Sequence, residues 1–190
     1  MAESASHEGD SSIIVSLSEA AMHMYTAAID ALPFVEDKKF HKRADVVLSG
    51  MRKLRTALTD AASSGRPSPG VIVELSNVRR RYDNLMAHAA TAPGTSLGIQ
   101  LYVTRVEAKV SAQEVANGIG LSGELLDAFE AGAEPTPEEA AKIRDAIAAL
   151  GGVPGIEHRD HQEHHEPEHS EPVEEHVNGW DESLVGEHAG

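Results

Sequence analysis

The chain has 190 residues, a formal net charge of −15 and no cysteine. The lack of cysteine excludes disulfide bonds and thiolate metal sites, and no apolar run approaches the roughly 20 residues that a membrane-spanning helix needs. No segment alternates between apolar and polar residues in the way that marks a half-buried strand. We therefore predict an all-α, cytoplasmic protein with no membrane contact.

The charge is distributed unevenly along the chain. Counted from Lys, Arg, Asp and Glu, the net charge by segment is −3 for residues 1–11, +3 for 12–96, −5 for 97–150 and −10 for 151–190. Nucleic acid is repelled by net acidity, but basic residues gathered in one segment can still make phosphate contacts. Composition and the positions of helix-breaking Gly and Pro residues predict four parts. They are a disordered N-terminus (1–11), a helical bundle (12–92), a helix-turn-helix domain (97–151) and an acidic, His-rich, disordered tail (152–190).

The first predicted helix of the bundle begins at Ser16, whose spacing to Glu19 is that of a capping box, and it ends at Pro33. Its apolar residues recur at the spacing of one helix face. The stripe predicted to face the core is Leu17, Ala21, Met24, Ala28 and Leu32.

Two further helices are predicted, one from about Asp37 to Ala62 and one that starts at Ser68-Pro69. Both carry apolar residues spaced alternately by four and three, which is the pattern of helices packed side by side. The predicted seams are Phe40, Ala44, Val47, Met51, Leu54, Leu58 and Ala61, and Val71, Leu75, Val78, Tyr82, Leu85 and Ala89. They indicate the interior of a three-helix antiparallel bundle or a surface for homodimerisation.

Two basic clusters lie outside these seams. They are Lys38, Lys39, Lys42 and Arg43 in the second helix, and Arg79, Arg80 and Arg81 in the third. Such patches bind phosphates and supply affinity without sequence information. They are also typical of a solvated helix face paired with nearby acids. Both interpretations stay open.

Local signals between residues 97 and 151 predict several short helices after a loop at 92–96. Two capping-box spacings mark helix starts, Ser111 to Glu114 and Thr136 to Glu139. Gly120 suits the left-handed conformation that ends a helix, and Ser122 suits the cap of the next one. The predicted core is Val115, Ala116, Ile119, Leu121, Leu126, Phe129, Ile143, Ile147 and Leu150.

Three motifs occur in order within this segment: Val110-Ser-Ala-Gln-Glu-Val-Ala116, Ile119-Gly-Leu-Ser122 and Phe129-Glu-Ala-Gly132. Together they resemble the phage-repressor or Cro-like helix-turn-helix family, also called XRE, over about fifty residues. The resemblance implies transcriptional regulation and a reading helix from about Gly123 to Ala131 that enters the DNA major groove. It implies that Gln113 approaches a phosphate and that the DNA-facing residues are Ser122, Gly123, Glu124 and Asp127.

Glu124 and Asp127 depart from the family pattern, in which Arg, Lys, Gln, Asn or Ser usually occupies such positions. Carboxylates accept hydrogen bonds from cytosine N4 but repel phosphates. Three interpretations stay open. The basic clusters supply phosphate affinity; or the motif is a scaffold that binds protein; or its acidic surface occupies a site on another nucleic-acid-binding protein.

The tail has too few apolar residues to offset the entropy of ordering. Its histidines alternate with carboxylates, and imidazole is a ligand for zinc or nickel. The candidate metal ligands are His158, His161, His164, His165 and His169. A pH response, a solubilising role and a docking peptide around Trp180 are the alternatives.

We expect no enzyme, because the chain shows neither a nucleophile elbow nor a phosphate-binding glycine loop. No small-molecule substrate and no cofactor are expected, apart from zinc or nickel on the tail. The leading prediction is a DNA-binding transcriptional regulator. The alternative is a protein-interaction adaptor that does not bind DNA. In that case metal or pH would modulate its binding to a partner through the tail. A homodimer or another protein is the expected partner.

Overall fold

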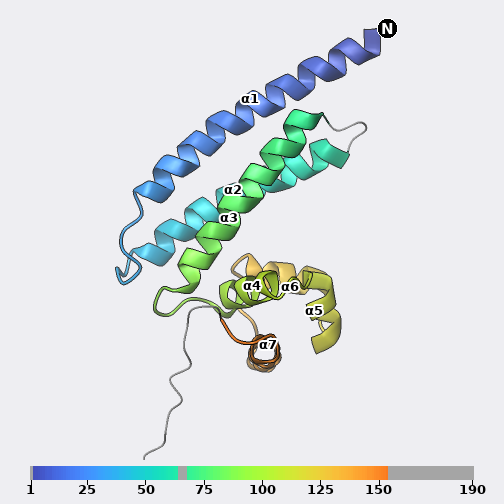
Figure 1. The fold of residues 1–190 in the computed structure, drawn as a ribbon. Helices are drawn as coiled ribbons and strands as arrows, with labels where there is room; N and C mark the ends of the chain where they lie inside the picture. The colour runs from blue at the N-terminus through green and yellow to red at the C-terminus, as the bar shows by residue number, and fades with distance from the viewer. Residues whose placement is uncertain (1, 64–67, 154–190) are drawn as a thin grey trace, which may run out of the picture. The chain divides into compact units, whose positions relative to one another are not determined.

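The computed structural model describes residues 2–63 and 68–153, with side chains described from residue 11 onward. These ranges are helical and contain no strand, which confirms the all-α prediction. The helices are α1 (Ala2–Asp30), α2 (Phe40–Ser63), α3 (Pro69–Ala90), α4 (Leu97–Glu107), α5 (Ala112–Ile119), α6 (Gly123–Glu130) and α7 (Pro137–Ala149) (Figure 1).

The predicted seams of α2 and α3 form the interface between these two helices. All six residues of the α3 seam are buried, and in the α2 seam only Leu54 and Ala61 are half-buried. The start of α3 is also confirmed, since Ser68 Oγ accepts a hydrogen bond from Val71 N and Pro69 occupies the first turn. Alternating spacing of four and three therefore identified this interface correctly.

Helix α1 differs from its prediction in both its start and its buried face. It begins at Ala2 rather than Ser16, and it therefore includes residues that composition predicts as disordered. Leu17 and Met24, predicted to face the core, are 66% and 71% exposed. Ala28 and Leu32 of the predicted stripe do face α2 and α3, and so do Ile14, Val15, Ser18, Met22, Tyr25 and Ile29. Because α1 is apolar on two sides, periodicity alone could not select the inner one.

Helices α4 to α7 pack around the core predicted for this segment. Six of its nine residues are buried, and Ile119, Leu121 and Leu150 are half-buried against them. Both capping boxes are present at the starts of α5 and α7. Helices α4 and α6 approach closely at Gly98, where a Cβ would collide with the carbonyl oxygen of Phe129.

Every described helix lies within one compact unit, Met1–Glu157. In that unit α3 also contacts α4, so the buried side chains form one connected cluster from α1 to α7. None of the described helices is both long enough and apolar enough to cross a membrane.

Candidate functional site

The turn between α5 and α6 is built as its sequence signals indicate. Gly120 ends α5 in the left-handed conformation, with φ 66° and ψ 40°. Leu121 N then donates to Ala116 O at 2.9 Å, and Ser122 Oγ accepts a hydrogen bond from Leu125 N at 3.2 Å. The chain thus starts α6 directly after a tight turn, with the first residues of α6 beside α5.

The structure brings Gln113 and Gly123 together. A Cβ on Gly123 would lie 2.5 Å from Gln113 Oε1, so the Gln113 side chain lies across the start of α6. Gln113 Nε2 also donates to Asn117 Oδ1 at 2.9 Å. The side chains of Ser122, Glu124 and Asp127 are exposed. Four of the five predicted reading residues are therefore exposed, and Gly123 is half-buried. We call the surface that these five residues form on α5, α6 and the turn between them the α5–α6 face.

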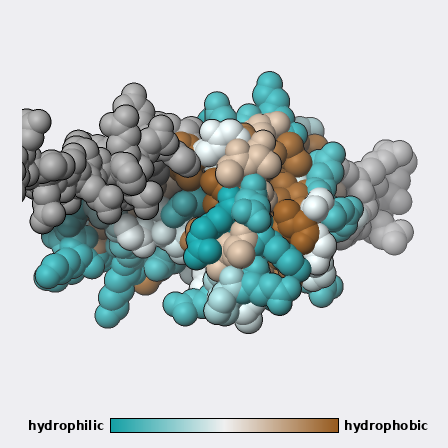
Figure 2. Space-filling view, turned by 90° about the horizontal axis from the view of Figure 1, so that it is seen from below, coloured by the Kyte–Doolittle hydropathy of each residue, from teal (hydrophilic) through white to brown (hydrophobic). Residues whose placement is uncertain are grey.

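The α5–α6 face is acidic. Glu124 and Asp127 project from α6, and Glu114 closes the cap of α5. The Ser111 hydroxyl, followed by the Ser111 backbone N–H, lowers the pKa of Glu114 below its ordinary value, so this carboxylate stays charged in mild acid. Seen from below, the side on which α4 to α7 lie in Figure 1, the surface shows hydrophilic side chains mixed with smaller hydrophobic areas (Figure 2).

Behind this face lies an ion pair that the sequence analysis missed. Arg105 on α4 donates to both carboxylate oxygens of Glu130 on α6, at 2.5 and 2.6 Å. Their side chains are only 14% and 7% exposed. Arg52 on α2 donates to the carbonyl oxygen of Glu130 at 3.1 Å, and the Arg105 guanidinium lies over the ring of Tyr102. The pair therefore joins α2, α4 and α6.

Burial and the mutual attraction of Arg105 and Glu130 act in opposite directions on the pKa of each group. Burial raises the pKa of Glu130 above its ordinary value, against the opposing hydrogen bonds and charge of Arg105. For Arg105, burial acts to lower the pKa, but the hydrogen bonds and charge of Glu130 outweigh it and raise the pKa. We expect both groups to be charged at neutral pH, because the bidentate geometry satisfies each of them.

A second polar contact connects α3 with α4. Tyr102 Oη donates to Asp83 Oδ1 at 2.5 Å, and burial, followed by this hydrogen bond, raises the pKa of Tyr102. The rings of Tyr82 and Tyr102 meet edge to face at 5.5 Å, and the Arg55 guanidinium lies over Tyr82 at 4.7 Å. These contacts hold α2, α3 and α4 together.

The two basic clusters are exposed but occupy different sides of α1. Lys39, Lys42 and Arg43 line a groove of about 650 Å³ between α1 and α2. Arg81 instead lines pockets between α1 and α3. In the described ranges, none of the seven cations lies within ion-pair distance of a carboxylate. The two clusters line different pockets and do not form one continuous surface.

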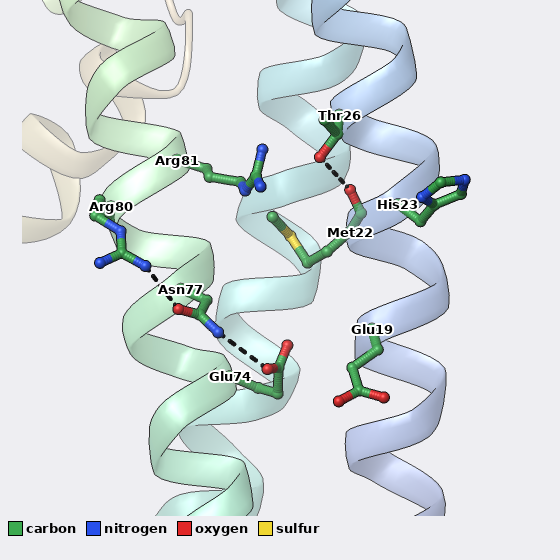
Figure 3. A pocket seen from close by; sticks show the side chains of 8 residues that line it. All are labelled: Glu19, Met22, His23, Thr26, Glu74, Asn77, Arg80 and Arg81. Carbon is green, nitrogen blue, oxygen red and sulfur yellow. Dashed lines mark hydrogen bonds between the residues drawn. The ribbon is translucent and has the colours of Figure 1, made fainter.

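One of the pockets between α1 and α3, of about 380 Å³, shows how these arginines are held (Figure 3). Glu74, buried on α3, accepts hydrogen bonds from Asn77 Nδ2 at 3.0 Å and Ser18 Oγ at 3.5 Å. Arg80 Nη2 donates to Asn77 Oδ1 at 2.8 Å, while Arg81 extends toward α1. The sequence analysis assigned no role to Glu74, because nothing in the local sequence indicates that a carboxylate beside the α3 seam is buried against α1.

The candidate metal ligands of the tail, from His158 to His169, lie outside the described residues. Within the described ranges, no group of three His, Cys, Asp or Glu side chains is placed to hold a metal ion. The metal hypothesis for the tail therefore stays a prediction.

Two comparisons found relatives of this chain. Residues 25–96, which span α2 and α3 and the end of α1, match the family MSMEG_6518_N, described as an N-terminal domain. Over 129 residues the chain is 57% identical to an uncharacterized protein of Mycolicibacterium smegmatis (strain ATCC 700084 / mc(2)155), an alignment that covers 68% of this chain and 100% of that relative. No solved structure matches the chain.

Proposed function

This chain belongs to the family of the MSMEG_6518_N domain, and we propose that it is a DNA-binding transcriptional regulator. In this proposal α1 to α3 are an antiparallel bundle, and α4 to α7 are a repressor-like helix-turn-helix domain. The observation that carries it is the α5–α6 turn, with left-handed Gly120, capping Ser122 and Gln113 lying across Gly123. A motif of this type presents the start of its second helix to the major groove.

Phosphate affinity comes mainly from the basic cluster before and at the start of α2 and from the cluster in α3, rather than from α6. The seven cations are exposed and none is neutralised by an acid within the described ranges. By contrast, Glu124 and Asp127 would repel phosphates and can only accept hydrogen bonds from bases such as cytosine. The proposal therefore assigns affinity to the bundle and weak sequence preference to α6.

A protein-interaction adaptor is the second candidate, and the acidic α5–α6 face favours it. Glu124 and Asp127 are exposed on the helix that would otherwise read DNA. An exposed carboxylate pair next to an uncharged turn suits a basic protein surface better than a phosphate backbone. In that case the helix-turn-helix serves as a scaffold.

An electrophoretic shift and fluorescence titration of the full chain with random duplex DNA would test the first candidate. For the three contacts of Arg79, Arg80 and Arg81 alone, we expect affinity to fall about 40-fold between about 50 and about 200 mM salt. Replacing Arg79, Arg80 and Arg81 with Gln should reduce the slope of log affinity against log salt by up to about 3. Glu124→Ala should leave binding intact, since this residue repels phosphate.

Lys53→Gln is the matched control, because Lys53 is an exposed cation of α2 outside both clusters. It should change the salt slope far less than the triple arginine variant. Salt-independent binding would contradict the electrostatic account. If no duplex shifts at the lower salt concentration, DNA binding is wrong and the adaptor becomes the better interpretation.

A further inference from the structure

The outward side of α1 carries a continuous apolar stripe. Its residues are spaced by 4, 3, 4, 3 and 4, and every one is exposed: Ile13, Leu17, Ala20, Met24, Ala27 and Ala31. Ala31 follows the last residue of α1 but still donates its N–H to Ala27 O, as in the helix. This spacing is the seam pattern of paired helices, and no charged residue interrupts it. We call these six residues the outer seam.

The outer seam lies opposite the side of α1 that already packs in the protein. Val15, Met22 and Ile29 face α2 and α3, and α1 contacts no other described helix. In Figure 1, one side of α1 runs along α2 and α3 and the other side faces away from them. A helix that is apolar on both sides is normally buried on both sides. The outer seam therefore lacks a partner within the described part of the chain.

We propose that the outer seam binds the outer seam of a second copy of this chain, with the two α1 helices antiparallel. The sizes of the side chains are self-complementary only in that orientation. In the antiparallel register centred between Ala20 and Met24, each large residue faces an alanine of the second copy, in the pairs Ile13 with Ala31, Leu17 with Ala27, and Met24 with Ala20. Facing large with small residues fills an interface evenly.

A parallel pair would place identical residues opposite each other. Leu17 would face Leu17, while Ala20, Ala27 and Ala31 would each face their own copies and leave gaps. Gaps between helices cost stability because the lining atoms lose contacts. A two-fold symmetric antiparallel pair also gives a closed dimer, the commonest form of homo-oligomer.

Charge is compatible with this arrangement. The charged residues nearest the outer seam in sequence are Glu19 and Asp30. The antiparallel register places Asp30 beside Ser16 of the second copy, so it brings no two carboxylates together. The segment 12–96, which contains the seam, has a net charge of +3, so the strong acidity of the whole chain is not concentrated here.

The size of the surface predicts a reversible dimer. The seam spans about 27 Å along a helix about 10 Å wide, or roughly 270 Å² in projection. Val46, 70% exposed on the neighbouring α2, extends the apolar surface across the groove between α1 and α2. An apolar area of a few hundred Å² is about as large as the largest patch on a typical monomer, and it is below the roughly 800 Å² per partner of a standard stable interface.

Sedimentation velocity of the full chain over a range of concentrations tests the proposal. We expect a concentration-dependent monomer–dimer equilibrium, and we expect Leu17→Glu to weaken dimerisation at least tenfold because it places a charge inside the seam. Glu19→Gln is the control, since this exposed residue of α1 lies outside the seam, and it should leave the equilibrium unchanged. Circular dichroism of each variant separates loss of dimer from loss of fold.

Disulfide trapping tests the orientation independently, because the chain has no cysteine of its own. The double variant Leu17→Cys/Ala27→Cys should form covalent dimers on oxidation, while Leu17→Cys alone should not. Efficient cross-linking by Leu17→Cys alone would show a parallel pair and overturn the register. A monomer at every concentration, or a dimer that Leu17→Glu leaves intact, would overturn the proposed interface. None of these results depends on DNA binding.

Discussion

The ion pair of Arg105 and Glu130 joins α4 and α6 through a largely buried, bidentate contact. Two hydrogen bonds join the side chains, and both are almost fully buried. Removing two charges from water is costly, so such a pair adds little net stability compared with apolar residues of the same size. Its value lies in fixing α4 against α6, because any other arrangement would leave a buried charge without a partner.

Replacing Glu130 with Gln should lower the free energy of unfolding by about 3 kcal/mol, since the Arg105 charge would stay buried without its counterion. Urea denaturation followed by circular dichroism measures this loss. Glu124→Gln is the matched control, because Glu124 is an exposed acid of the same helix, and its effect should stay within about 0.5 kcal/mol. A loss below about 1 kcal/mol for Glu130→Gln would show that the pair behaves like a surface ion pair.

At the scale of elements, the crossing of α4 and α6 depends on the absence of a side chain at Gly98. The backbone of α6 occupies the space in which a Cβ would lie, so the two helices are closer than ordinary side chains allow. This explains a glycine inside a helix, where it otherwise costs stability relative to alanine. It also places the α5–α6 face at a defined position relative to α4.

Gly98→Ala should therefore destabilise the protein by about 2 kcal/mol through overpacking. Gly118→Ala provides a control with the same chemical change, because Gly118 also lies in a helix but has no atom near its added Cβ. That control should be neutral or stabilising by up to about 1 kcal/mol, through helix propensity. Thermal or urea denaturation of both variants measures the difference, and equal effects at the two positions would contradict the proposed close crossing.

At the scale of the whole molecule, the buried residues form one cluster from α1 to α7. Polar contacts follow the same connection, since Arg52 reaches Glu130 and Tyr102 reaches Asp83. Shared core contacts couple the unfolding of neighbouring segments, so this continuity predicts that the bundle and the segment 97–151 unfold together.

Ile143→Ala tests the coupled unfolding from α7, the last described helix. Ile143 is fully buried in α7, and its truncation should cost about 3 kcal/mol. If the segments unfold together, native-state hydrogen exchange should show the same loss of protection in the slowest amides of α2 and α3 as in those of α7. Unchanged protection in α2 and α3 would show that the two predicted domains unfold independently.

Sequence by itself determined the features that depend on neighbours within a few residues. These include the all-α class, the α2 and α3 seams, and the caps at Ser68, Ser111 and Thr136. Each follows from the period of a helix or from the unpaired amides at its start. The core around Phe129 was predictable for the same reason, because its members repeat at helical spacing on short, well-delimited helices.

Only the tertiary structure decided which side of α1 faces inward, that Arg105 pairs with Glu130, and that Gly98 lies at a helix crossing. A two-sided apolar helix offers two equivalent faces, and the choice depends on the shape of α2 and α3. The ion pair and the crossing join residues more than twenty positions apart, and no local pattern encodes such distances. The outer seam became visible for the same reason, since its exposure is known only once the inner face has been assigned.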